Sequence, residues 1–106
     1  MVKVQTGLEA LCETPGLLSQ RRWALLANHA AVDSDLVPAR VLLTGAGCGR
    51  PVRLFAPEHG PDGTAQDMEA VSDTRDAVTG CEVRSLYGRD AASLEPLSED
   101  LRDLEA

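Results

Sequence analysis

The chain has 106 residues, of which 43% are hydrophobic, enough for one small domain and little more. Its formal net charge is −7, and the excess of acidic residues lies almost entirely after residue 60. The sequence therefore lacks the basic face that a nucleic-acid-binding protein presents to phosphates.

The sequence also indicates in which cellular compartment the protein is found. Its first residues lack the basic and then apolar pattern of a signal peptide, and no apolar run is long enough to cross a bilayer. The three cysteines, Cys12, Cys48 and Cys81, are odd in number and widely spaced, which favours reduced thiols over a disulfide framework. Together these features predict a cytoplasmic protein without a membrane span.

The first half of the chain predicts two helices with a strand between them. A short helix is expected over residues 7–12, and an apolar strand over residues 23–27. Residues 36–43 have the apolar spacing of a second helix. Asp33 or Asp35 is expected to cap its start.

The second half predicts two strands and a helix around a long polar segment. The strands are expected over residues 52–56 and 82–87, and residues 57–80 are rich in glycine and polar side chains without a sustained apolar period. A final helix is expected over residues 95–104, where four leucines recur at helical spacing: Leu94, Leu97, Leu101 and Leu104.

The three predicted strands begin about thirty residues apart, the usual length of a βαβ unit. The predicted fold class is therefore α/β, an incomplete Rossmann-like parallel sheet of about three strands with flanking helices. No strand is predicted after the last helix, so the return strand of that unit is expected to be missing.

Polar side chains follow each predicted strand, where ligands of open parallel sheets usually bind. Asn28 and His29 follow the first strand, Pro57-Glu58-His59-Gly60 follows the second, and Tyr87 and Gly88 follow the third. If the strands are parallel, all three groups lie along one edge of the sheet.

Glu58 is the best single candidate for chemistry. A glutamate that turns over a cleft at a strand end is partly desolvated, and desolvation raises a carboxyl pKa toward that of a general acid at neutral pH. Pro57 fixes its approach and Gly60 permits a sharp exit. The alternative is that Glu58 caps a turn or faces solvent.

The neighbouring residues leave alternatives open. His29 and His59, with Glu58, can form a metal site or be ordinary loop histidines. Asn28 either orients a sugar hydroxyl or caps a turn. Tyr87 is either a stacking platform or a core aromatic residue.

A family resemblance adds to these observations. Residues 54–60 and 63–65 resemble the "LFxPEHGxxGxA" signature of the NamZ-type (YbbC-like) exo-β-N-acetylmuramidases. Residues 79–88 are similar to the family's "TGxPVYSLYG" segment, residues 25–33 to its "LxTNxTGVD" segment, and residues 7–9 to its opening "TGLD". The similar segments occur in the same order and span nearly the whole chain.

The resemblance implies a glycoside hydrolase of the bacterial cell wall. Members release terminal N-acetylmuramic acid from the non-reducing end of peptidoglycan fragments, and export of some members is compatible with the resemblance. The resemblance makes Glu58 the catalytic residue. The predicted substrate-binding residues are Asn28, His59, Gly60 and Tyr87, and no metal or cofactor is expected.

The resemblance also implies a longer protein, in which a Rossmann-like N-terminal domain is paired with a C-terminal domain. Residues 1–106 are then the N-terminal part of the catalytic domain, truncated at its C-terminal end, and inactive alone. The partners expected are muramic-acid glycans and the missing C-terminal domain.

Two other functions remain open. A non-catalytic remnant that binds a sugar or a partner chain is favoured by Asp62, which stands where the family usually has a basic residue. A metal-dependent hydrolase would use His29, Glu58 and His59. Glycoside hydrolysis needs a second carboxyl role, expected at Glu69 or in the missing portion.

Overall fold

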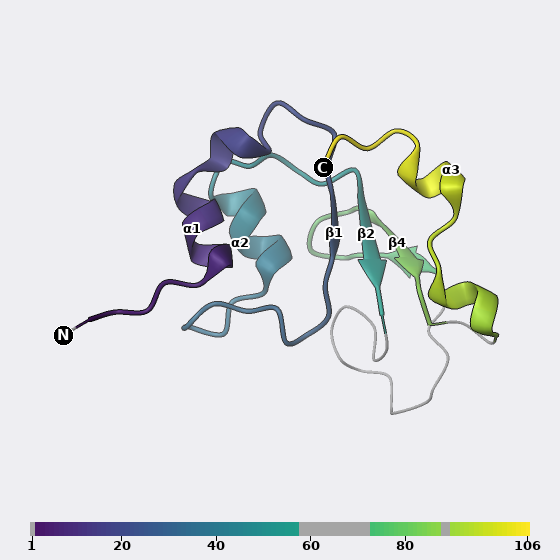
Figure 1. Cartoon of the computed structure of the whole chain (residues 1–106), viewed down its shortest axis with the longest axis horizontal. Coiled ribbons are helices and arrows are strands. Elements are labelled where there is room, and N and C mark those ends of the chain that lie inside the picture. The colour runs from purple at the N-terminus through teal and green to yellow at the C-terminus, as the bar shows by residue number, and fades with distance from the viewer. Residues whose placement is uncertain (1, 58–72, 88–89) are drawn as a thin grey trace.

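The computed structural model describes residues 2–57, 73–87 and 90–106. In this part of the chain, two helices pack together beside a small sheet, and a third short helix lies on the other side (Figure 1). The C-terminus comes back to the beginning of the first strand, whereas the N-terminus extends away from the sheet (Figure 1).

The described residues form a four-stranded sheet in the order β1-β2-β4-β3. Strands β1, β2 and β4 are parallel, and β3 runs antiparallel along β4. The predicted incomplete Rossmann-like parallel sheet is therefore confirmed. The strands are β1 (Ala24–Leu26), β2 (Arg53–Ala56), β3 (Thr74–Arg75) and β4 (Glu82–Ser85).

Strand β3 corrects the prediction of an unstructured segment up to residue 80. It is only two residues long, and both of them are exposed. A strand that short has no apolar alternation, so the sequence carries no signal for it.

Five helical elements accompany the sheet within the described residues. The helix predicted at residues 7–12 is confirmed and is held by a capping box. The hydroxyl of Thr6 accepts a hydrogen bond from the Glu9 amide, and the Glu9 carboxylate accepts one from the Thr6 amide. The elements are α1 (Gly7–Glu13), η1 (Pro15–Leu17), α2 (Ala39–Gly45), η2 (Ala91–Leu94) and α3 (Ser98–Leu101).

Helix α2 begins at Ala39, three residues later than predicted. The Asp33 carboxylate accepts hydrogen bonds from the amides of Asp35 and Val37, both at 2.9 Å, and so closes a turn ahead of the helix. Leu36 within this turn has a left-handed φ of 62°. The aspartate therefore organises the connection and does not cap α2.

The prediction of a single helix over residues 95–104 is wrong. The chain forms η2 and then, after Pro96, the four-residue α3. The leucines at 94, 97 and 101 remain 53%, 59% and 44% exposed, so their helical spacing does not produce a buried face. Asp100 is the residue that α3 buries, at 5% exposure.

The two faces of the sheet differ because side chains alternate along each strand. Leu54 and Val83 lie on one face and form an apolar cluster with Leu25. A second cluster around Trp23 and Leu43 extends from Leu25 to α1. The core therefore lies on the α1–α2 side of the sheet.

The other face is held to α3 by ion pairs. Arg53 of β2 and Arg84 of β4 both point to Asp100. The Arg84 Nε lies 3.1 Å from its Oδ1, and the Arg53 Nη1 donates to the Asp100 carbonyl at 2.7 Å. Because this face presents arginines, a carboxylate and not the leucine periodicity determines how the C-terminal segment docks.

The last residues form no strand after α3, but their backbone bonds to the sheet. The Glu105 amide donates to the Arg22 carbonyl at 2.7 Å, and the Ala24 amide donates to the Ala106 carbonyl at 3.1 Å. The end of the chain thus lies along the outer edge of β1.

Among the described residues, no helix is long and apolar enough to span a bilayer.

The contacts of Asp100 predict a specific loss of stability. Asp100→Asn should lower the free energy of unfolding by about 1.5–3 kcal/mol, because Arg84 loses a charged hydrogen-bonding partner and Arg53 loses an ion pair at 3.8 Å. Glu99→Gln removes the same charge from an exposed position of the same helix and should have little effect. Urea denaturation of both variants tests this, and equal midpoints would contradict it.

Candidate functional site

The candidate site lies at the carboxyl edge of β1, β2 and β4. The Ala27 amide, just after β1, donates to the Phe55 carbonyl at 3.2 Å, and the Leu86 amide, just after β4, donates to the Ala56 carbonyl at 2.8 Å. These bonds carry the parallel pairing of β2 beyond the ends of β1 and β4. Asn28 and Tyr87 therefore lie at the same edge as the end of β2, as the strand pattern predicts.

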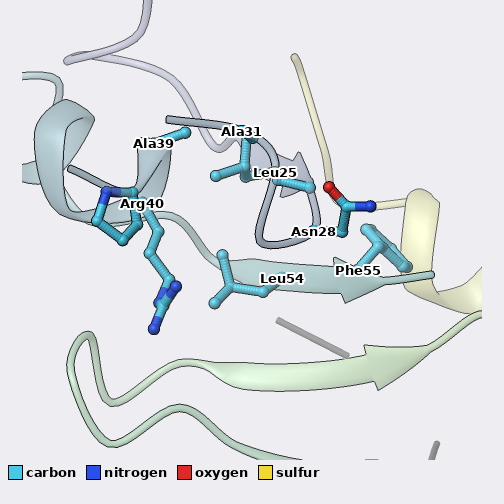
Figure 2. A pocket seen from close by; sticks show the side chains of 9 residues that line it. Leu25, Asn28, Ala31, Ala39, Arg40, Leu54 and Phe55 are labelled. Carbon is cyan, nitrogen blue, oxygen red and sulfur yellow. The ribbon is translucent and has the colours of Figure 1, made fainter. Parts of the chain in front are cut away.

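Asn28 is half-buried and its side chain is oriented by the backbone. Its Oδ1 accepts a hydrogen bond from the Ala30 amide at 2.9 Å, which closes a turn directly after β1. Because Oδ1 is engaged, the Nδ2 group is the remaining polar end of this side chain. Figure 2 shows Asn28 next to Phe55 at the carboxyl end of β2.

A small hollow of about 20 Å³, room for about one water molecule, lies beside Asn28. One wall is the segment after the turn, which folds back so that the Ala39 amide donates to the Ala31 carbonyl at 2.8 Å. The lining is mostly apolar and includes one amide and one guanidinium. It consists of Leu25, Ala27, Asn28, Ala31, Pro38, Ala39, Arg40, Leu54 and Phe55.

Arg40 extends from α2 past Leu54 toward the connection between β3 and β4 (Figure 2). Its Nε lies 3.2 Å from the Asp76 Oδ2, and the side chains are 9% and 2% exposed. The same oxygen accepts hydrogen bonds from the Thr79 hydroxyl at 2.6 Å and the Thr79 amide at 2.9 Å. This ion pair holds the β3–β4 connection against α2, and its arginine also lines the hollow.

The surroundings of Asp76 keep it ionised. Burial by itself raises the pKa of this carboxyl, but the hydrogen bonds from Thr79 and the Arg40 guanidinium outweigh it, and the pKa lies below the ordinary value of 3.8. A carboxylate in this state is a poor proton donor at neutral pH. Asp76, one of the acidic residues in the predicted loop, thus serves the fold.

Sequence reasoning missed the partnership of Arg40 and Asp76. The two residues are 36 positions apart and belong to elements that no local pattern connects. The spacing from Asp76 to Thr79 and the following Gly80, which has a φ of 73°, is typical of a side-chain-capped turn and was the available signal. It indicates a turn but not the buried arginine.

At the far side of the edge, β4 ends in a set of side-chain caps. The Ser85 amide donates to the Asp73 carboxylate at 2.7 Å, and the Ser85 hydroxyl accepts from the Tyr87 amide at 3.0 Å. Tyr87 is half-buried. Its place at the edge is observed, and its role in binding a substrate stays a prediction.

The predicted residues Glu58, His59 and Gly60 lie outside the described residues, as do Asp62 and Glu69. Pro57, which immediately precedes Glu58, is described and half-buried at the end of β2. His29 is exposed beside Asn28. Within residues 2–57, 73–87 and 90–106, no three His, Cys, Asp or Glu side chains cluster closely enough to hold a metal ion.

Comparison of the sequence and the fold with known proteins identifies a family. The sequence model described as "Exo-beta-N-acetylmuramidase NamZ, N-terminal" matches residues 23–106, which include all four strands and the segment from Pro57 to Gly60. The chain belongs to this NamZ family.

Two relatives agree with the assignment. The chain is 34% identical over 104 residues to the peptidoglycan beta-N-acetylmuramidase NamZ of Bacillus subtilis (strain 168), a match that covers 97% of this chain and 24% of that protein. It superposes on the crystal structure of a DUF1343 family protein from Bacteroides fragilis NCTC 9343 with a TM-score of 0.78 and 31% identity. That superposition covers 99% of this chain and 25% of the other. The chain thus spans about a quarter of the length of the NamZ relatives it matches.

The buried ion pair predicts a pH dependence. Because the folded-state pKa of Asp76 is lowered, its carboxylate stabilises the fold above the unfolded-state pKa, and this stabilisation is lost as the pH falls below 3.8. Asp76→Asn removes the carboxylate that pairs with the Arg40 guanidinium inside the fold. It should lower the free energy of unfolding by about 3–5 kcal/mol near neutral pH.

The measurement is chemical denaturation of both proteins between pH 7 and pH 3. The difference between wild type and Asp76→Asn should be constant above about pH 5 and shrink at lower pH. Asp35→Asn, which removes an exposed carboxylate, is the matched control and should track the wild type. A difference between the two proteins at pH 3 that is as large as the difference at pH 7 would contradict the assignment.

Proposed function

We propose that the chain supplies the catalytic edge of a glycoside hydrolase that releases terminal N-acetylmuramic acid from peptidoglycan fragments. The family match over residues 23–106 carries this proposal, because that stretch contains Glu58. The Bacillus subtilis relative is named for this activity. All three cysteines are unpaired thiols, which supports a reducing compartment, and we propose the cytoplasm.

In this proposal Glu58 is the catalytic carboxyl. In the sequence it directly follows Pro57, which lies at the end of β2, and β2 pairs with both β1 and β4. A carboxyl at such an edge can donate a proton to the leaving glycosidic oxygen, which is the acid role that glycoside hydrolysis requires. His59 and Gly60, the next residues, are proposed to contact the sugar.

Asn28 and Tyr87 are proposed to bind the sugar from the two sides of β2. The Asn28 Oδ1 is committed to the Ala30 amide, so its Nδ2 is the group available to donate to a sugar oxygen. Tyr87, after β4, offers an aromatic ring and a hydroxyl. Apolar surface with a few placed polar groups is typical of small-ligand sites.

A second carboxyl must act as base or nucleophile. Asp76 is unsuited to this role because Arg40 and Thr79 hold it inside the fold. We propose that the second group is Glu69 or belongs to the part of the longer relatives that this chain does not span.

The proposal predicts the effect of removing the acid. In a chain extended with the remainder of the family protein, Glu58→Gln should abolish release of N-acetylmuramic acid from a chromogenic glycoside, a loss of at least about 100-fold. Glu13→Gln, at the exposed end of α1, makes the same chemical change away from the edge and should retain activity.

Two outcomes would overturn the proposed role of Glu58 as the catalytic acid. A folded Glu58→Gln variant with turnover near that of the wild type would remove Glu58 from the chemistry. Loss of activity after treatment with a chelator, restored by adding a divalent metal, would instead favour a metal-dependent hydrolase that uses His29, Glu58 and His59.

Asn28 allows a test of binding against folding. Asn28→Asp keeps the oxygen that accepts from the Ala30 amide but removes the Nδ2 donor. The KM of this variant should be about tenfold higher than that of the wild type, because one lost hydrogen bond costs about 1.4 kcal/mol of binding free energy. Its Tm should be unchanged. If Asn28 only caps its turn, KM of Asn28→Asp will equal that of the wild type.

A further inference from the structure

We propose that Cys12 and Cys48 form a redox switch, a reversible disulfide that ties α1 to the segment after α2. Both are free thiols in the structure. A low-molecular-weight disulfide such as glutathione disulfide would oxidise the pair, and a small thiol would reduce it again. The inference concerns the helical layer beside the sheet and does not depend on the proposed glycosidase chemistry.

The fold brings the two cysteines together although they are distant in the sequence. Cys12 lies in the last turn of α1, and Cys48 follows α2 on the way to β2. Cys48 is fully buried with Trp23 and Leu43, and Cys12 packs against this cluster. The two helices lie side by side (Figure 1). Both sulfur atoms therefore belong to the same small core.

The electrostatics of Cys48 agree with this packing. Burial raises the pKa of the Cys48 thiol, and Cys12 raises it further. One charge shifts the pKa of another group strongly only at short range, so the two thiols are near neighbours. At neutral pH Cys48 remains a protonated thiol beside Cys12.

The third cysteine belongs to a different part of the core. Cys81 is buried in the cluster that contains Leu54 and Val83. Its Sγ donates to the Pro51 carbonyl at 3.0 Å. The expected pairing is therefore between the other two cysteines, and Cys81 serves as an internal control.

The two members of the pair have different roles because they differ in exposure. Cys12 is half-buried, whereas Cys48 is completely buried. Helix α1 has only seven residues and none of them is fully buried, so it opens locally more readily than the strands do. Cys12 is therefore the thiol that meets the oxidant, and Cys48 is the thiol that resolves the product.

The oxidation proceeds by two thiol–disulfide exchanges. The deprotonated Cys12 attacks one sulfur of glutathione disulfide, whose S–S bond breaks, and one glutathione leaves and takes up the proton that Cys12 lost. The deprotonated Cys48 then attacks the Cys12 Sγ, and the second glutathione leaves with the proton of Cys48. The two protein thiols lose two electrons, and glutathione disulfide gains them as it becomes two glutathione molecules.

The disulfide would stabilise the layer on which β1 packs. It closes a loop that contains β1, Asn28 and α2, which restricts the unfolded chain. It also adds a covalent bond to α1, which otherwise depends on partly buried side chains such as Leu8 and Leu11. Intracellular disulfides are usually transient and redox-sensing, which fits a pair that is reduced in the structure.

The test is to treat the folded 106-residue chain with glutathione disulfide and to map its disulfides by mass spectrometry without a reductant. We expect peptides joined through Cys12 and Cys48, and a Tm about 10 °C above that of the reduced chain. The Ala10 amide, which bonds to the Thr6 carbonyl within α1, should exchange about tenfold more slowly after oxidation. Dithiothreitol should reverse all three changes.

Two serine variants are the matched controls. Cys81→Ser keeps a donor for the Pro51 carbonyl and should still form the disulfide and gain in Tm. Cys12→Ser lacks the first thiol and should gain nothing from the same treatment. Each variant is compared with its own reduced form, so any effect of the substitution itself on stability cancels.

Several outcomes would overturn the proposal. They are a wild-type chain that does not react, one that stops as a glutathione adduct of Cys12, a disulfide that involves Cys81, and a disulfide between two chains. A disulfide between Cys12 and Cys48 that changes neither the Tm nor the exchange of the Ala10 amide would contradict the tethering of α1. Glycosidase activity does not enter these measurements.

Discussion

The position of β2 between two parallel neighbours is the constraint on which the rest of the structure depends. Its register with β1 and β4 makes all three strands end at one edge, and the bonds from Ala27 to Phe55 and from Leu86 to Ala56 extend that alignment beyond the strands. Asn28, Pro57 and Tyr87 come together only for this reason, because they are separated by about thirty residues in the chain.

The helices on the two faces of the sheet are held by different interactions. On one face, burial of apolar side chains such as Leu54 and Val83 attaches α1 and α2. On the other, α3 is attached at Asp100, whose buried carboxylate accepts from Arg84 and whose carbonyl accepts from Arg53. Charged pairing is directional, whereas apolar burial is not, so the second face fixes the C-terminal segment in one position.

The sequence was a good guide where a single local pattern decides the outcome. Apolar runs predicted three strands that are confirmed, and their spacing predicted parallel pairing. It failed where partners distant in the chain decide. The leucines of residues 94–104 have helical spacing, yet Asp100 determines the docking of α3. The acidic residue Asp76 reads as solvated until Arg40 is placed against it. Asn28 and Tyr87 were placed correctly because their position follows from strand ends alone.

The two sides of the candidate site differ in what holds the ends of the strands. On the β4 side, the Asp73 carboxylate caps the Ser85 amide, and β3 pairs antiparallel with β4. On the β1 side, the Asn28 Oδ1 closes a turn with the Ala30 amide, and the chain folds back so that the Ala39 amide donates to the Ala31 carbonyl. The β4 side is therefore held by strand pairing and a side-chain cap, whereas the β1 side is held by a turn whose residues also line the hollow beside Phe55.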